Sequence, residues 1–169
     1  MSEGTNTWYR NLRRSDRALE PADAMQLIDD NCYGVLAMAW PDGSPYAVPI
    51  NYGREGDVIY MHSATTGQKL DILRANPRAV LSVVEGGEIT HGDLTCSASV
   101  TFRSALAFGK VAVVSEPALR LHGLRVLCLA CKVPVPVEGT ANAAHFSARA
   151  NDTVVLALQV EHVSGKARA

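Results

Sequence analysis

The fold is decided by residues 48–84, which read VPINYGREGDVIYMHSATTGQKLDILRANPRAVLSVV. Two runs of alternating apolar residues, joined by the turn REGD, predict two neighbouring strands. The second run ends at His62, and small and polar residues follow as far as Gly67. A short helical pattern then ends before Pro77, and the apolar run AVLSVV predicts another strand. This segment therefore predicts strands that follow one another closely, with a short helix inserted between two of them.

The rest of the chain continues this organisation. Residues 33–53 predict a hairpin, because the turn PDGS separates two apolar runs. Neighbouring strands with inserted helices indicate a mainly β protein, an antiparallel barrel with peripheral helices rather than a βαβ sheet. No GxGxxG or GxxxxGK[ST] motif is present, which excludes Rossmann and P-loop nucleotide sites. The other expected elements are a helix at 21–31, a loop at 86–93, strands at 94–102 and 104–114 separated by Arg103, a bulge at Gly109, helices at 116–132 and 140–150, and a strand at 153–163.

Composition indicates one globular domain. The chain has 169 residues, of which 47% are hydrophobic and 20% charged, with a formal net charge of −1. Such a charge gives no basic field for nucleic acid, and we find no apolar run long enough to span a bilayer. The polar N-terminus lacks the apolar segment of a signal peptide, so the expected compartment is the cytoplasm. We expect a polar arm over residues 1–20 and a single domain over residues 21–169.

The cysteines and histidines do not predict a metal or nucleophilic site. Cys128 and Cys131 form a CxxC motif, but neither a second cysteine pair nor a histidine pair completes a zinc site. Together with Leu121 and Leu124 they follow helical spacing, which predicts a buried stripe. The other cysteines, Cys32 and Cys96, do not imply disulfides in a chain of this length without an export signal. No Ser-His-Asp or Cys-His arrangement can be argued from spacing, so no catalytic residue is assigned.

The polar run after the second strand has the composition of a phosphate-binding turn. His62, Ser63 and two threonines supply hydrogen-bond donors, and Gly67 allows close approach of the backbone. Lys69 opens the next helix, where a cation opposes the helix dipole. A bound anion between Lys69 and the helix N-terminus would resolve that conflict. The alternative is a solvated lysine beside a polar turn.

Residues 48–84 resemble the core block of the flavin-binding split-barrel superfamily that includes pyridoxamine 5′-phosphate oxidase. The resemblance is closest to the branch of the 5-nitroimidazole-resistance proteins. The most specific part is the block from Pro49 to Pro77. Three further segments support it: LRRSDRALE at 12–20, FRSALAFGKVAVV at 102–114 and VVLALQVEHVSGKA at 154–167.

The resemblance implies an antiparallel split β-barrel with FMN bound at a homodimer interface. It places Pro49, Ile50 and Asn51 along the isoalloxazine ring of the flavin. The other cofactor-binding residues that it implies are His62, Ser63 and Lys69 at the phosphate, and Ser104 with its neighbour Arg103 approaching from a later strand.

We therefore expect an FMN-dependent oxidoreductase that moves electrons from a reduced nicotinamide to a small organic acceptor, of the nitroaromatic or quinone type. Two departures from the family pattern matter. Gln68 stands where relatives often carry a second basic residue, and the chain ends in SGKARA without the Arg- and Trp-containing segment that holds pyridoxine phosphate. Two alternatives remain: a flavin-binding or sensor module without turnover, and the same barrel holding haem, with His62 as axial ligand, or a deazaflavin.

Overall fold

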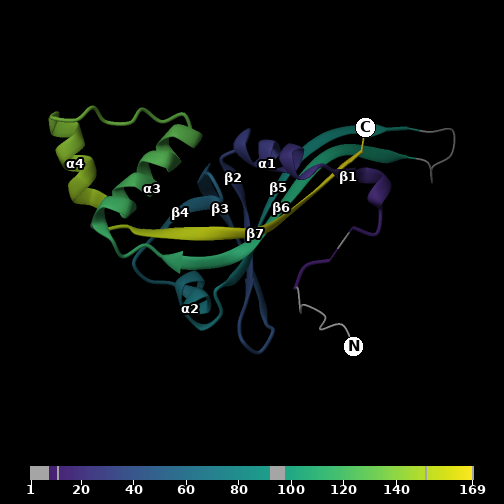
Figure 1. Cartoon of the computed structure of the whole chain (residues 1–169), viewed down its shortest axis with the longest axis horizontal. Helices are drawn as coiled ribbons and strands as arrows, with labels where there is room; N and C mark the ends of the chain where they lie inside the picture. The colour runs from purple at the N-terminus through teal and green to yellow at the C-terminus, as the bar shows by residue number, and fades with distance from the viewer. Residues whose placement is uncertain (1–7, 11, 92–97, 151, 169) are drawn as a thin grey trace.

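The computed structural model describes residues 8–10, 12–91, 98–150 and 152–168 of the chain (Figure 1). Its strands pair in the order β7-β4-β3-β2-β5-β6, and β6 then pairs with β7, which closes the ring. Every pairing is antiparallel, so the predicted split β-barrel is confirmed. The strands are β1 (Ala18–Leu19), β2 (Tyr33–Ala39), β3 (Pro45–Glu55), β4 (Val58–Ser63), β5 (Arg78–Thr90), β6 (Ser99–Val113) and β7 (Val154–Arg168).

The helices lie outside the barrel, as the sequence predicts. A 3-10 turn precedes β1, which pairs with one end of β7. In Figure 1, α3 and α4 lie together at one end of the molecule, while the β5–β6 ribbon extends toward the other. None of the described helices is long and apolar enough to cross a membrane. The helical elements are η1 (Ser15–Arg17), α1 (Pro21–Asp29), α2 (Gln68–Ala75), α3 (Pro117–Ala130) and α4 (Ala141–Ala150).

The barrel interior is filled by alternate residues of its strands. Leu36 on β2, Ile50 on β3 and Leu158 on β7 are among the buried side chains of one continuous cluster. Helix α1 covers one opening of the barrel, and the hydroxyl of buried Tyr52 donates a 2.8 Å hydrogen bond to the carbonyl of Ile28. Burial raises the pKa of Tyr52, so this phenol remains a neutral donor at physiological pH.

A second, smaller cluster fixes α3 on the outside of the barrel. Val155 of β7 points away from the main core and packs with Tyr60, Val126 and Leu127. The helix approaches closely because a Cβ on Gly123 would lie only 2.7 Å from Tyr60 Cδ1. The first part of strand β7 is therefore covered on both faces, which explains its continuous apolar run from Val154 to Leu158.

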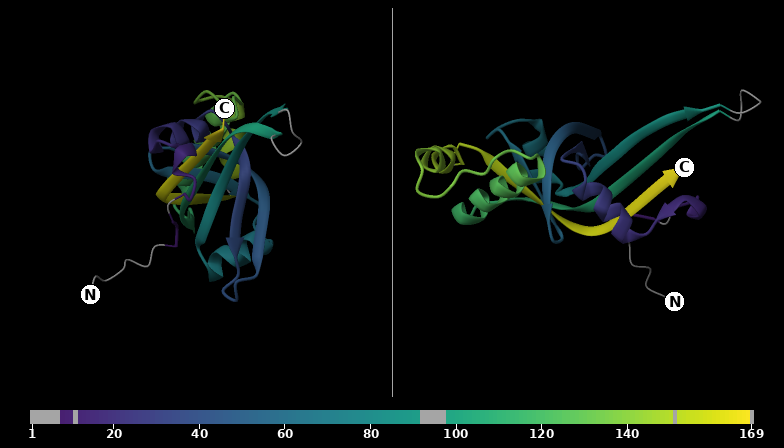
Figure 2. Two further views of the ribbon diagram at one scale, coloured as in Figure 1. Left: turned by 90° about the vertical axis from the view of Figure 1, so that its right-hand side faces the viewer. Right: turned by 90° about the horizontal axis from the view of Figure 1, so that it is seen from above.

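Two expectations for the middle of the chain are wrong. The predicted loop at 86–93 is strand as far as Thr90, and Arg103 lies inside the single strand β6 rather than between two strands. Glycines suggested a loop, but at Gly87 a Cβ would meet Thr101 Oγ1 at 2.0 Å, so the glycine permits close pairing. Figure 2 shows the resulting ribbon reaching beyond the barrel. Residues 92–97, with part of the predicted strand 94–102 and Cys96, lie outside the described residues.

The predicted bulge at Gly109 is confirmed. The register of β6 against β7 shifts between Phe108 and Gly109. A Cβ at this glycine would lie 2.0 Å from the carbonyl oxygen of Gln159, so no larger residue fits the shifted register. The shift bends the strand where it leaves the barrel wall.

Candidate functional site

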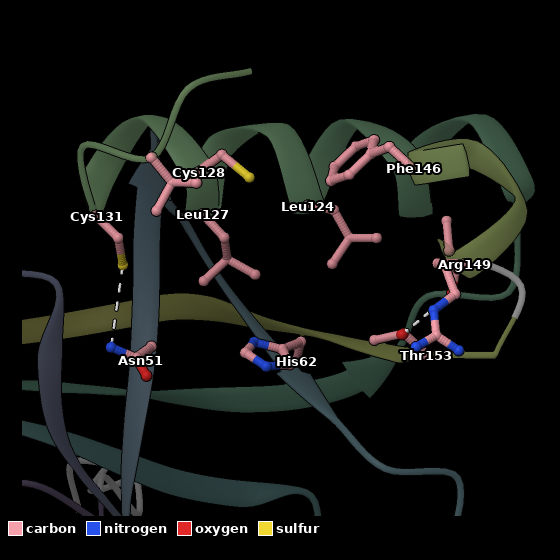
Figure 3. Close-up of a pocket in the computed structure, with 11 residues that line it drawn as sticks. Asn51, His62, Leu124, Leu127, Cys128, Cys131, Phe146, Arg149 and Thr153 are labelled. Carbon is pink, nitrogen blue, oxygen red and sulfur yellow. Dashed lines mark hydrogen bonds between the residues drawn. The ribbon is translucent and has the colours of Figure 1, made fainter. Parts of the chain in front are cut away.

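A cavity of about 400 Å³ lies between the outer face of the barrel and the helices α3 and α4 (Figure 3). Its floor carries Asn51 from β3 and His62 from β4. These strands are neighbours, and their outward-pointing residues meet beneath α3. A Cβ on Gly53 would lie 2.7 Å from the carbonyl of Val126, so this glycine sets how near α3 comes. The remaining lining residues are Leu124, Leu127, Cys128, Cys131, Val133, Phe146, Arg149, Ala150 and Thr153.

The predicted buried stripe on α3 is wrong in detail. Its four members are half-buried, and Leu124, Cys128 and Cys131 line the cavity instead of the packed core. The face of α3 that packs on the barrel is the neighbouring one, next to the predicted stripe. Gly123 lies on this face and allows the close contact described above. The buried residues of α3 are Gly123, Val126 and Leu127.

The cavity thiols remain protonated at neutral pH. Burial raises the pKa of Cys128, and burial together with a contact to Cys32 raises the pKa of Cys131 to about 11. The Cys131 thiol also donates to the carbonyl of Cys32 over 3.9 Å, and Asn51 Nδ2 lies 4.0 Å from its sulfur. Such thiols act as small apolar wall groups rather than nucleophiles. Within the described residues, no group of histidines, cysteines and acids has the arrangement of a metal site.

The exit of β4 leads directly from the cavity floor to a cation. His62 lines the cavity, Ser63 ends the strand half-buried, and Lys69 follows in the first turn of α2. Burial lowers the pKa of Lys69, and no acid of the described chain pairs with its ammonium. Gly67, the residue before α2, has a φ of 131°, and no side chain caps the first N–H groups of the helix. Unpaired N–H donors beside an unpaired ammonium form a suitable site for an anion.

The residues predicted along a flavin ring point in different directions. Pro49 and Asn51 lie exposed on the outer face of β3, whereas Ile50 points into the core and is only 6% exposed. The side chain of Ile50 therefore packs the barrel, and only its backbone faces the outer surface.

Arg103 and Ser104 lie apart from the other predicted site residues within one chain. On β7, Ser63 pairs with Val154 at one end, while Arg103 pairs with Ala167 near the other. Arg103 forms a 3.5 Å ion pair with Glu85, and the Ser104 hydroxyl donates to a β7 carbonyl.

The outer face of the β2–β3–β5 sheet is unusually apolar for an exposed surface. Tyr33 is 59% exposed and Val84 62%, and Val35, two residues further along β2, is 38% exposed. Val35 pairs with Pro49 on one side and with Ser82 on the other, so these residues cross three adjacent strands. An exposed apolar face of this kind is typical of a protein interface.

Sequence reasoning missed the residues that α4 and the start of β7 bring to the cavity. Phe146 and Arg149 are spaced i, i+3 on α4, and Thr153 immediately precedes β7. The only signal was this helical spacing. An arginine near a helix C-terminus is also explained by the helix dipole, so the pattern alone could not identify a cavity residue.

The chain resembles several known proteins over nearly its whole length. A family model described as pyridoxamine 5′-phosphate oxidase matches residues 20–167. A solved structure of a candidate 5-nitroimidazole antibiotic resistance protein from Bacteroides thetaiotaomicron superposes with a TM-score of 0.74 at 21% identity, covering 89% of this chain and 86% of that one. A flavocytochrome from Azotobacter vinelandii gives 0.77 at 19% identity, covering 95% and 73%.

Two further comparisons agree with this fold. A FAD-binding protein from Mesorhizobium loti gives a TM-score of 0.65 at 23% identity, covering 90% of this chain and 96% of that one. Among curated proteins, an uncharacterized protein of Rhizobium meliloti is 36% identical over 63 residues, which span 33% of this chain and 41% of that relative.

Proposed function

Because the chain belongs to the pyridoxamine 5′-phosphate oxidase family, we propose that it is an FMN-dependent oxidoreductase. It takes electrons from a reduced nicotinamide and passes them to a small organic acceptor of the nitroaromatic or quinone type. Bound FMN supplies the redox chemistry, so the protein needs no catalytic triad. We also propose the cytoplasm as its compartment, since reduced nicotinamide is supplied there.

The observation that carries this proposal is the half-buried ammonium of Lys69, which no acid in the described part of the chain pairs, beside a helix start without a side-chain cap. A phosphate dianion would supply the charge that Lys69 lacks and accept hydrogen bonds from the first N–H groups of α2. His62 and Ser63, at the end of the preceding strand, are further donors before α2; as consecutive strand residues they point to opposite faces, with His62 lining the cavity. The donor set suits one terminal phosphate, which favours FMN over the dinucleotide FAD.

The outer face of β3 suits a flat ring system next to this phosphate site. Pro49 offers an exposed apolar surface, and the Asn51 amide lies at the cavity edge. A ring along this face would border the cavity, so an acceptor inside the cavity could lie near it. The role of the protein residues is to hold the two molecules side by side and to keep water from the apolar walls.

We propose that the working unit is a homodimer. Arg103 and Ser104 pair with one end of β7, whereas Ser63, which precedes α2 and Lys69, pairs with the other end. These two residues would therefore join the flavin site from a second copy. The exposed apolar face around Val35 on β2 and Val84 on β5 lies beside β3, the strand that carries Pro49. A second copy could pack against this face. An obligate dimer would bury at least about 1,600 Å² in total. Light scattering at low micromolar concentration tests this, and an 18.1 kDa particle with FMN bound would contradict it.

Haem is the second candidate, because the His62 imidazole lines the cavity and has no hydrogen-bond partner among the described residues. An absorbance spectrum of the purified protein separates the candidates, since haem, flavin and deazaflavin absorb differently. Ligand released by heat is then compared with FMN and FAD standards by chromatography. We expect FMN, and steady-state oxidation of reduced nicotinamide in the presence of a quinone or nitroaromatic. Release of FAD or haem, or no FMN binding on reconstitution, would overturn the proposal; binding without turnover would leave a flavin-binding module.

A further inference from the structure

The described residues that line the cavity include a basic side chain but no acidic one. Among its described lining residues there is no aspartate or glutamate, while Arg149 carries a permanent positive charge and His62 can accept a proton. Arg149 is exposed at the edge of the cavity, and the walls between it and His62 are mostly apolar. An anion is therefore favoured at the Arg149 end of this cavity.

Arg149 is held in place by its backbone, while its guanidinium has no ion-pair partner among the described residues. Its carbonyl accepts hydrogen bonds from the Thr153 hydroxyl at 3.2 Å and from the Asp152 N–H at 3.1 Å, which ties the end of α4 to the residues that precede β7. No acid of the described chain lies within ion-pair distance of its guanidinium. By contrast, Arg54, Arg74 and Arg125 each pair with a carboxylate.

Most of the polar residues of the cavity lie at its two ends, with apolar side chains between them. In Figure 3, Arg149 and Thr153 lie at one end, Asn51 and Cys131 at the other, and His62 on the floor between them. Apolar side chains of α3 and the ring of Phe146 cover the intervening space. A ligand that fills it has a polar or charged group at one end and a flat apolar body against Phe146.

The size of the cavity limits that body. Its volume of about 400 Å³ lies near the lower end of the range for ligand pockets, roughly 300–1,000 Å³. A compound of one ring, or of two fused rings, is a suitable occupant.

We propose that the cavity binds a small aromatic monoanion, whose carboxylate pairs with Arg149 and whose ring packs against Phe146 and Leu124. That this molecule is the electron acceptor rests on the proposed function, whereas its binding does not. A planar guanidinium can hold both carboxylate oxygens at once, which fixes the ring direction along the cavity. The electron-accepting end of the ring then lies toward His62 and Asn51.

Isothermal titration calorimetry of 4-nitrobenzoate and its neutral analogue 4-nitrobenzamide tests this inference, with the protein in its FMN-free and FMN-loaded forms. The two probes share the ring and the nitro group and differ in charge. We expect 4-nitrobenzoate to bind roughly tenfold or more tightly than the amide. Arg149→Met should remove that preference while leaving the amide affinity unchanged, and Arg149→Lys should retain part of it.

Two control variants locate the effect. Arg74→Met removes an exposed arginine from α2, and Lys69→Ala removes the cation of the phosphate site; both should leave the preference for 4-nitrobenzoate intact. Equal affinities for the two probes, binding of neither, or an unchanged preference in Arg149→Met would overturn the inference. FMN titration of the same samples keeps the two proposals apart. FMN binding without probe selectivity sinks only the inference, and Arg149-dependent selectivity without FMN binding sinks only the proposed function.

Discussion

Helices α2 and α3 both follow a barrel strand, yet they begin in opposite ways. At α3, the Glu116 carboxylate accepts from the N–H groups of Ala118 and Leu119, and Pro117 fills the first position. At α2, Gly67 provides no capping group, and Lys69 adds a positive charge to the positive end of the helix dipole. One helix start is complete within the chain, and the other lacks an acceptor and an anion. The difference is what the proposed phosphate site at α2 requires, whereas the start of α3 needs no ligand.

The strongest test of this difference is Lys69→Ala. Loss of one charge-assisted contact to a phosphate costs about 1.5–3 kcal/mol, which raises the dissociation constant roughly ten- to a hundredfold. Riboflavin has no phosphate and should bind the variant almost as well as the wild type. Titration of flavin fluorescence quenching with both flavins measures the effect.

Matched variants show whether the position or merely the charge matters. Arg74→Ala removes a cation from the opposite end of the same helix and should leave FMN affinity nearly unchanged. Lys69→Arg should be partly tolerated, and His62→Ala should weaken FMN selectively but less than Lys69→Ala. If FMN and riboflavin have the same affinities in the wild type and Lys69→Ala, the exit of β4 is only a turn.

The complementary change at α3 is Glu116→Gln, which should lower the melting temperature and leave flavin affinity unchanged. The hydrogen bonds from Ala118 and Leu119 lower the pKa of Glu116 below its usual value of 4.5. A lowered carboxyl pKa means that the stabilisation is complete above about pH 4.5 and is lost as the pH falls through the lower folded-state value. The melting temperatures of the wild type and Glu116→Gln, measured at several pH values, should therefore converge in acid. A loss of FMN affinity in Glu116→Gln would show that α3 also serves the flavin.

Much of the fold could be predicted because it follows from short-range patterns. The hairpin at 33–53, the helix at Pro117–Ala130 and the bulge at Gly109 are confirmed, and each depends on residues close in sequence. The β5–β6 ribbon was missed because its glycines serve pairing between distant residues, which local propensity cannot reveal.

The candidate site could be predicted only in part for the same reason. The polar run after the strand predicts His62 as a site residue, the resemblance implies Asn51, and the structure brings both to one cavity. The roof of that cavity depends on how closely α3 approaches Gly53 and on where α4 then lies, so Phe146 and Arg149 carried no distinct signal in the sequence. The wrong face of α3 was chosen because helical spacing gives a stripe but not the partner it meets.

Substitutions of Gln68 give a smaller test of the difference between the starts of α2 and α3. Gln68 is exposed in the first turn of α2, at the position where the family resemblance implies a second basic residue. A charge near a helix N-terminus is worth about 0.3–1 kcal/mol, so Gln68→Glu should weaken FMN roughly two- to fivefold and stabilise the FMN-free protein. Gln68→Arg should do the reverse in both measurements. FMN titrations and thermal melts of both variants test this. An anion at this helix start is supported if each variant changes FMN affinity and FMN-free stability in opposite directions. Changes in the same direction would speak against it.

The smallest effect concerns the stability of the FMN-free protein in Lys69→Met, which replaces a half-buried, unpaired ammonium with a side chain of similar length. Burial lowers the pKa of Lys69 from its usual 10.5, so the unfolded chain holds this proton more firmly than the folded one. The wild type is therefore penalised at neutral pH, and the penalty fades as the pH rises through the folded-state pKa toward 10.5. Without FMN, Lys69→Met should melt slightly above the wild type at pH 7, and the two curves of melting temperature against pH should meet near pH 10.5.

With saturating FMN the order of the two melting temperatures should invert, because only the wild type gains the phosphate contact. A variant that is less stable in both conditions would mean that Lys69 already has a partner within the chain and that α2, like α3, is complete on its own.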